Sequence, residues 1–229
     1  RFSHVMAIAL DPTANHRRGV IRCIVSREGD VDVKGFVDRS ALHIVSGNSL
    51  EKFEIGERLA IENEREIVDS LQDGELDYLG LEDPDLWFDE QSGLMHLYCT
   101  MPFISREKSK QFSRIHLGHA QGKDLDTLQM TAPVLFGSKE DYRNARAKEV
   151  SIAPLNSRGV RLNLFEGHDK PSPRSDTYST VRVATACDMG SAWEFGPTVF
   201  HPGERGIAWI GGHASPGPLL PKTFIDLGG

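Results

Sequence analysis

The stretch "SALHIVSGNSLEKFEIGERLAI", residues 40–61, contains an alternating strand-like run, a turn of small polar residues and a second strand-like run. The same design returns in "SRIHLGHAQGKDLDTLQMTAPVL" at 113–135 and in "STVRVATACDMGSAWEFGPTVF" at 179–200. Apolar residues that alternate with polar ones, closed by Gly, Asp or Asn, are typical of β-strands. The sequence therefore predicts three copies of one strand-turn-strand unit.

Two further apolar runs precede each unit. They are "HVMAIAL" and "GVIRCIVSR", then "DLWF" and "LMHLYCT", then "VSIAPL" and "VRLNLFE". Four strands repeated about every 70 residues are typical of β-propeller blades, which stack because no single sheet can bury both of its faces. We expect an all-β fold, a β-propeller of four-stranded antiparallel blades. A β-sandwich with a similar number of strands is the alternative, although it offers no reason for the repeat.

The repeat also sets the expected domain organisation. We expect a single β-propeller domain over 1–229, with blade 1 at about 1–61, blade 2 at about 77–136, blade 3 at about 147–201 and the start of blade 4 at about 206–229. Three blades and the beginning of a fourth cannot close a ring, so the propeller is expected to be incomplete in this chain. The best helical candidate is the short run "ENEREIVDSL" at 62–71.

Composition and charge exclude several classes of partner. The formal net charge is -7, and the 26 Lys and Arg residues are scattered, which argues against a nucleic-acid partner. No apolar run approaches the roughly 18 to 20 residues that cross a bilayer, and the N-terminal residues lack a leader pattern, so a soluble chain without a membrane partner is expected.

The cysteines and histidines give no sign of a cofactor. Cys23, Cys99 and Cys187 each lie in an apolar strand-like run without metal-ligand spacing, so we expect buried free thiols in a reducing, cytoplasmic compartment. The histidines form no zinc-site spacing and are taken as ordinary strand or surface residues. No cofactor and no metal site is predicted.

Charged and titratable residues recur at comparable points of the repeat. In a propeller the first strand of each blade lines the central channel, so these side chains should converge on one small volume. They are His4 in "FSHVMAIAL", Glu82 and Asp83 in "LEDPDLWF", Lys148 and Glu149 in "AKEVSIAPL", and His213 and Ser215 in "GGHASPGPLL".

The acidic motif suits acid–base chemistry if it lies in such a channel. Strand alternation would point Asp83 and Asp85 to one side and Glu82 to the other, unless Pro84 introduces a bulge. Burial raises a carboxyl pKa and a neighbouring cation such as Lys148 lowers it, so two acids can become one proton donor and one base. Cleavage of a glycosidic bond needs that division of roles.

The same residues also have purely structural explanations. A Glu-Asp-Pro sequence at a strand entry is often only a turn. A Lys-Glu pair such as Lys148 and Glu149 is more often a solvated pair. Trp87, Trp193 and Trp209 suit core or inter-blade packing better than sugar stacking. The functional interpretation rests on the coincidence of these groups at one point of successive repeats.

At these residues the sequence resembles the five-bladed β-propeller glycosidases, and within them the β-mannoside phosphorylase and hydrolase family. Glu82, Asp83 and Pro84 follow the family's Glu-Asp-Pro-Arg motif. "RIHLGHAQGKDL" and "TVRVATACDM" follow its strand-and-turn pattern, and "IGGHASPGPLLP" resembles its fourth-blade opening. Lys148 and Glu149 match its third-blade opening, and Arg27 matches the arginine that ends its first hairpin.

The resemblance implies that Asp83 is the proton donor to the glycosidic oxygen. Two departures concern phosphate: the motif's arginine is replaced by Asp85, and the arginine ending the third blade's second strand is replaced by Glu166. Guanidinium groups bind phosphate bidentately, whereas carboxylates repel it, so hydrolysis is favoured over phosphorolysis.

The leading hypothesis is a glycosidase that cleaves an oligosaccharide, with a mannoside as the family's suggestion. Its catalytic residues would be Asp83 as acid and Glu149 as base. Its substrate-binding residues would be Glu82, Arg27, Lys148, His213, Ser215, His4 and Asp85. The alternatives are a glycoside phosphorylase and a non-catalytic propeller that binds a glycan or a protein. The oligomeric state and the sugar linkage are not indicated by the sequence.

Overall fold

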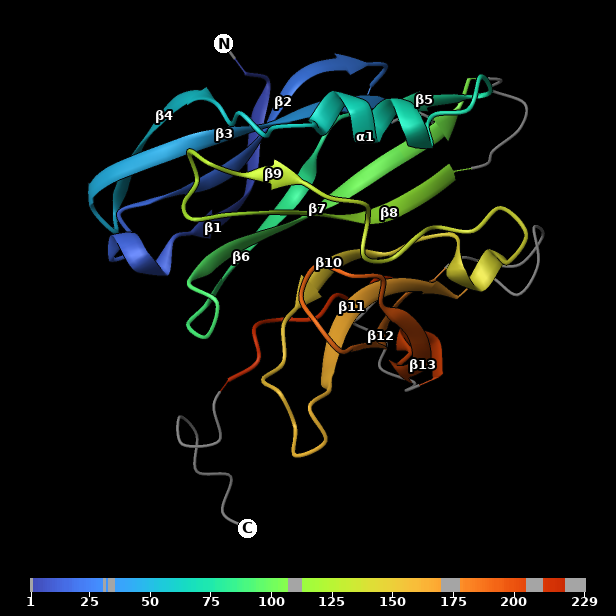
Figure 1. The fold of residues 1–229 in the computed structure, drawn as a ribbon. Helices are drawn as coiled ribbons and strands as arrows, with labels where there is room; N and C mark the ends of the chain where they lie inside the picture. The colour runs from blue at the N-terminus through green and yellow to red at the C-terminus, as the bar shows by residue number, and fades with distance from the viewer. Residues whose placement is uncertain are drawn as a thin grey trace.

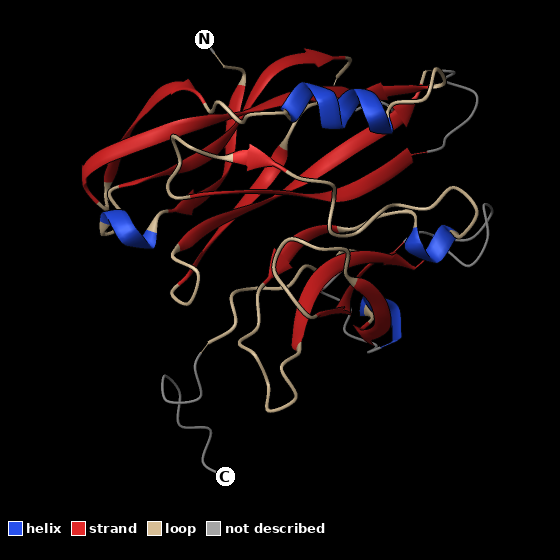
Figure 2. Ribbon diagram, viewed as in Figure 1, coloured by secondary structure: helices blue, strands red, loops and turns tan. Residues whose placement is uncertain are grey.

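Three antiparallel sheets follow one another along the chain (Figure 1). The computed structural model describes residues 2–30, 32, 36–106, 113–169, 178–204 and 212–220. Strands dominate this part of the chain, and its single α-helix is α1 (Glu64–Leu71), at the expected helical run (Figure 2). Short 3-10 turns are η1 (Pro12–Ala14), η2 (Tyr142–Asn144) and η3 (Pro202–Glu204).

Each sheet has its strands in chain order, as the repeat predicts. The first contains β1 (His4–Leu10), β2 (Arg18–Glu28), β3 (Val37–Ser49) and β4 (Lys52–Arg58). The second contains β6 (Glu82–Asp89), β7 (Leu94–Ser105), β8 (Ser113–Gly122) and β9 (Gln129–Met130), with β5 (Leu76–Tyr78) on the far end of β7. The third contains β10 (Lys148–Ser151), β11 (Arg161–Asp169), β12 (Tyr178–Ala186) and β13 (Glu194–Phe200).

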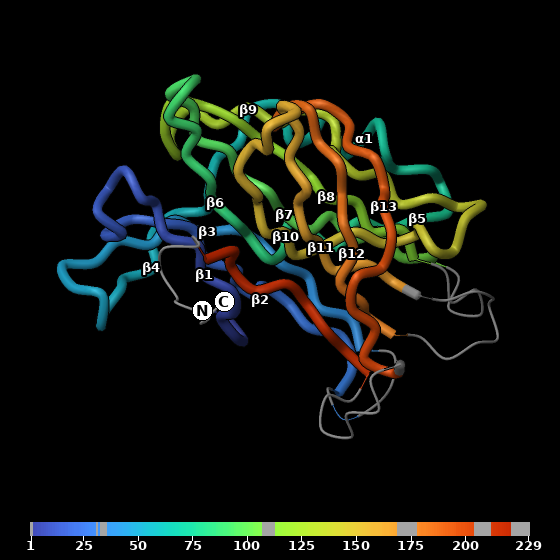
Figure 3. The backbone as a smooth tube through the Cα atoms, turned by 90° about the horizontal axis from the view of Figure 1, so that it is seen from below, coloured from blue at the N-terminus to red at the C-terminus, as the bar shows by residue number. Residues whose placement is uncertain are grey.

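The sheets are three successive blades of a β-propeller, so the predicted fold class is confirmed. Figure 3, which views the molecule from below, shows the third blade across the lower side of the second. The expected fourth blade falls partly on residues 205–211 and 221–229, outside the described residues, as does Trp209. Residues 212–220 form no strand. This segment contacts the third blade, because Ser151 Oγ of β10 donates to the Gly217 carbonyl at 2.5 Å.

The strand β7 shows why the blades stack. Its side chains alternate between two faces, so Leu97, Met101 and Phe103 enter a core shared with the first blade and α1. Tyr98 points to the other face and joins a second core with Phe165 of the third blade. Both faces of the second blade are thereby buried, which a single sheet cannot achieve alone.

Two expectations about buried residues have different outcomes. Cys23 and Cys99 are buried free thiols, but Cys187 is exposed, so the prediction of three buried cysteines is wrong for that residue. Cys187 follows the end of β12, where the strand gives way to a turn that leaves the sheet. Trp193 is buried in the core between the second and third blades, as inter-blade packing predicts.

Candidate functional site

A β-bulge interrupts the first strand of each of the three described blades. The register shifts between Met6 and Ile8 in β1, between Glu82 and Asp85 in β6, and between Lys148 and Val150 in β10. At each bulge one residue has a positive φ: Ala7 at 38°, Asp83 at 45° and Glu149 at 44°. A bulge bends the strand and re-aims its side chains, and left-handed backbone costs a non-glycine residue free energy. The two predicted catalytic acids therefore occupy equivalent, strained positions of successive blades.

Arg22 of β2 connects the first blade to the acidic motif of the second. Its Nη1 donates to Asp83 Oδ1 at 2.8 Å and its Nη2 donates to Glu82 Oε1 at 2.7 Å. Its Nε donates to Ser40 Oγ at 3.0 Å, and the Ser40 hydroxyl donates to Glu82 Oε1 at 3.0 Å. Because the bulge breaks the alternation, both carboxylates reach one guanidinium instead of facing opposite sides.

Gly80 makes this approach possible. Its φ is +102°, and a Cβ at this position would overlap the carbonyl oxygen of Ser40. The chain can therefore pass close to β3 only with glycine here. The backbone N–H of Ser40 donates to the Leu79 carbonyl at 2.8 Å, which fixes the entry into β6.

Burial gives the acidic motif unusual proton affinity. Burial raises the pKa of Glu82 to about 7, although the charge of Arg22 opposes the shift and that of Asp83 adds to it. Burial likewise raises the pKa of Asp85 to about 7, while a hydrogen bond from the Leu86 backbone opposes it. Two carboxyl groups of one strand thus titrate near neutral pH instead of near pH 4.

A second charged group opens the third blade. Lys148 Nζ lies 3.0 Å from Glu166 Oε1 and 3.8 Å from Glu149 Oε1. The Ser215 hydroxyl donates a short hydrogen bond to Glu166 Oε2. Burial lowers the pKa of Lys148, but the surrounding carboxylates, with Glu166 foremost, outweigh it and raise that pKa above its ordinary value. Burial raises the pKa of Glu149, an effect that Ser215 partly offsets.

The two groups share one electrostatic environment. The charge of Asp83 raises the pKa of both Lys148 and Glu149, and Lys148 lowers the pKa of Glu82. The strand β6 contacts β1, β2 and β3 of the first blade and β10 of the third. The structure therefore brings Glu82, Asp83, Lys148, Glu149 and Ser215 to the place where the first strands of the blades meet.

Other predicted residues lie at the edge of this place or beyond it. Arg27 Nε donates to Asp38 Oδ1 at 2.5 Å and makes no ion pair with Glu82 or Asp83 among the described residues. His4 is exposed on the first blade. His213 Nδ1 lies 2.9 Å from Ser179 Oγ on the third blade.

Sequence reasoning missed Arg22 and Ser40 as members of the site and assigned Glu166 only as a replaced arginine. Arg22 faces Met6 in β1 and Leu42 in β3, within an otherwise apolar run. A single cation inside an apolar strand is a signal that a buried carboxylate awaits it, because an unpaired buried charge is costly. Glu166 faces Lys148 directly across β10 and β11.

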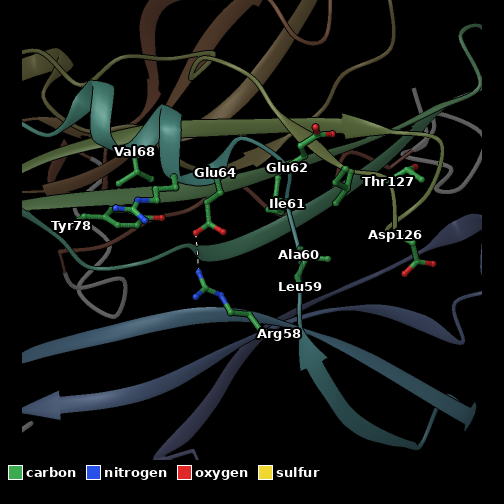
Figure 4. A pocket seen from close by; sticks show the side chains of 12 residues that line it. Arg58, Leu59, Ala60, Ile61, Glu62, Glu64, Val68, Tyr78, Asp126 and Thr127 are labelled. Atoms are coloured by element: carbon green, nitrogen blue, oxygen red, sulfur yellow. Dashed lines mark hydrogen bonds and ion pairs between the residues drawn. The ribbon is translucent and has the colours of Figure 1, made fainter.

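A wide cavity lies elsewhere in the described chain. It measures about 960 Å³ and is formed by the end of β4, α1, β5 and the β8–β9 loop. Figure 4 shows Arg58 and Glu64 facing each other across it, with Arg58 Nη2 3.0 Å from Glu64 Oε1. None of the predicted site residues lines this cavity.

The described residues show neither a metal site nor a membrane-spanning helix. No group of three or more His, Cys, Asp or Glu side chains is placed to hold a metal ion. No helix in this part of the chain has the length and apolar character needed to span a membrane.

Comparisons with known proteins match the fold but not the sequence. No family model and no curated protein matches this chain. A β-1,2-mannobiose phosphorylase from Listeria innocua superposes with a TM-score of 0.51 at 14% identity, over 86% of this chain and 59% of its own. A family 117 glycoside hydrolase from Zobellia galactanivorans superposes with a TM-score of 0.53 at 9% identity, over 84% of this chain and 54% of its own.

A structure from a study of mannoside phosphorylases and β-1,2-mannosidic hydrolases gives a TM-score of 0.51 at 17% identity, over 85% of this chain and 50% of its own. The chain thus spans between half and three fifths of the length of these proteins. At these identities the likeness concerns the fold, and it agrees with the resemblance to propeller glycosidases that the motifs predict.

Proposed function

We propose that this chain carries the acidic site of a glycosidase and cleaves a glycosidic bond of an oligosaccharide by hydrolysis. The observation that carries the proposal is the pair of strained carboxylates, Asp83 and Glu149, at matching bulges of adjacent blades. Strained backbone persists where the surrounding structure holds it, and it gathers at active sites. A likeness in fold to glycoside hydrolases and phosphorylases supports the same reaction class.

In the proposed mechanism Asp83 delivers a proton to the departing glycosidic oxygen. Glu82 shares Arg22 with Asp83, and its pKa of about 7 lets it hold a proton at neutral pH. Glu82 passes this proton to Asp83 when Asp83 protonates the leaving oxygen, and Arg22 balances the carboxylate charge that remains. Glu149 is the general base. It takes a proton from the water molecule whose oxygen attacks the anomeric carbon.

The charge balance around Lys148 favours water over phosphate as the attacking group. Glu166 lies 3.0 Å from the ammonium group and is almost completely buried, so it already neutralises the cation that phosphate would need. Glu149 and Asp83 add further negative charge nearby. A phosphate dianion would be repelled, whereas a neutral sugar with hydroxyl groups would not.

The test is the release of mannose from β-1,2-mannobiose, with and without inorganic phosphate. We expect release without phosphate, and a loss of at least about 100-fold for Asp83→Asn and for Glu149→Gln at unchanged melting temperature. Asparagine tolerates the positive φ at position 83, so the first variant isolates the proton. Asp69→Asn, an exposed change on α1, is the matched control.

Two outcomes would contradict the proposal. Product that forms only when phosphate is present would indicate a phosphorylase. Glycan binding that survives the double variant Asp83→Asn and Glu149→Gln, with no product from either protein, would indicate a non-catalytic glycan-binding propeller.

A further inference from the structure

A second cavity lies between the second and third blades. It measures about 460 Å³ and is lined by the β6–β7 turn, the β12–β13 turn and parts of β7, β8 and β11. A monosaccharide fits within such a volume. Glu82 and Asp89 are the first and last residues of β6, and a strand of this length spans roughly 23 Å. The cavity includes Asp89, so it lies at the end of β6 opposite the acidic motif.

Arg161 gives this cavity a positive charge without a carboxylate partner. The residue is 7% exposed and is the first residue of β11. Its Nη1 donates to the Ala153 carbonyl at 2.7 Å, and its guanidinium lies 5.8 Å from the centre of the Trp87 ring. No carboxylate of the described residues forms an ion pair with it. A buried cation without a direct ion-pair partner is costly, and a carboxylate placed on the guanidinium would remove that cost.

His96 supplies a second unsatisfied group. It is 3% exposed and lines the cavity. Its Nδ1 lies 2.9 Å from His119 Nε2, and His119 Nδ1 lies 2.8 Å from Thr131 Oγ1. The other ring nitrogen of His96, Nε2, is buried and has no hydrogen-bond partner in the described chain. This atom is closed to solvent, so a hydroxyl group reaches it only after a small rotation of the ring. A neutral imidazole nitrogen then donates to or accepts from that hydroxyl group.

Two carboxylates complete the polar lining. Asp89 Oδ2 accepts from Ser92 Oγ at 2.6 Å, and Asp188 Oδ2 accepts from Ser191 Oγ at 2.6 Å. Hydrogen bonds from these hydroxyl groups lower the pKa of both acids, which keeps them ionised at neutral pH. Ionised carboxylates accept hydrogen bonds from hydroxyl groups but repel a multiply charged anion. The lining therefore combines one cation with several acceptors.

We propose that this cavity binds a sugar acid of monosaccharide size, with its carboxylate on Arg161 and its hydroxyl groups on His96, Asp89 and Asp188. A single carboxylate forms an ion pair with the buried guanidinium, and hydroxyl groups form hydrogen bonds with the other three residues. A simple carboxylate would leave the acceptors unused, and a neutral sugar would leave Arg161 unpaired. The site is separate from the proposed catalytic acids and does not depend on their activity.

The experiment is calorimetric titration of the full chain with D-glucuronate, D-glucose and acetate. We expect glucuronate to bind at least tenfold more tightly than either of the other two. Arg161→Gln should lower the affinity for glucuronate at least tenfold. Arg158→Gln, an exposed arginine of the same β10–β11 loop outside the cavity, should leave the affinity unchanged. Asp83→Asn should also leave it unchanged, which separates this site from the proposed glycosidase site.

Equal affinity for glucuronate and glucose, or for glucuronate and acetate, would overturn the proposal, and so would absence of glucuronate binding. Because Arg161 is buried, its variant is first compared with the wild type by thermal melting. If Arg161→Gln does not fold, Asp188→Asn replaces it, since Asp188 is exposed, lines the cavity and is one of the proposed hydroxyl acceptors. That variant should weaken glucuronate at least threefold, and unchanged affinity would refute the assignment.

Discussion

Asp83 and Glu149 are structural equivalents: each sits at the bulge of the first strand of its blade, with φ of 45° and 44°. Ala7 occupies the same place in the first blade, with φ of 38°. The sequence alignment of the blades placed His4 at that point, three residues too early. The bulge is therefore a property of the repeat, and two of its three copies carry a carboxylate.

The first prediction concerns the free energy that the bulge stores. Ala7 is exposed, so Ala7→Gly changes little besides the backbone. Left-handed backbone costs a non-glycine residue about 1–2 kcal/mol, and glycine costs about 0.5–1 kcal/mol in chain entropy. We expect Ala7→Gly to raise the free energy of unfolding by about 0.5–1 kcal/mol in urea titrations.

The control is Ala132→Gly, at an exposed alanine without a positive φ. It should lower stability by about 0.5–1 kcal/mol. If both variants lose stability equally, the backbone at position 7 is not strained.

The second prediction concerns pH. Glu82 has a pKa of about 7 in the folded chain and about 4.5 when exposed, so the folded state holds a proton that the unfolded state releases between these values. Its stabilising contribution is complete below about pH 4.5 and is lost as the pH rises through about 7. Glu82→Gln removes this dependence, which is worth about 3 kcal/mol.

Urea unfolding of wild type and Glu82→Gln at pH values from about 4.5 to 8 measures the difference. The wild type should lose more stability over this range than the variant does. Glu54→Gln, an exposed change on β4, serves as control and should follow the wild type. Parallel curves for wild type and Glu82→Gln would show that this carboxyl is not protonated near neutral pH.

The third prediction concerns phosphate. Glu166→Gln removes the buried carboxylate 3.0 Å from Lys148 and leaves the ammonium group without its main counter-charge. We expect inorganic phosphate to bind this variant roughly tenfold more tightly than the wild type, a change of about 1.4 kcal/mol. Calorimetric titration with phosphate measures it, after circular dichroism has shown that the variant folds.

Glu194→Gln, an exposed change on β13 of the same blade, should leave phosphate affinity as it is. Phosphate affinity that is unaffected by Glu166→Gln would mean that Glu166 does not shield Lys148 from anions.

Much of the fold follows from local pattern. The alternating runs predict strands at 40–61, 113–135 and 179–200, and the structure has β3, β4, β8, β9, β12 and β13 there. The alternating pattern is visible in the sequence because one face of each strand is buried and carries apolar side chains. Cys187 was misassigned because its apolar neighbours belong to the end of a strand, and burial ends where the chain turns away.

Part of the candidate site also follows from the sequence, and part depends on the tertiary structure. The sequence by itself determined that Glu82 and Asp83 share a motif and that Lys148 and Glu149 hold the matching place in the next blade, because repeats are a property of order along the chain. Only the tertiary structure decided that Arg22 holds both acids, and that Arg27, which was predicted to bind substrate, pairs with Asp38. An ion pair depends on distances between strands, and a bulge that shifts the register changes those distances without a clear signal in the sequence.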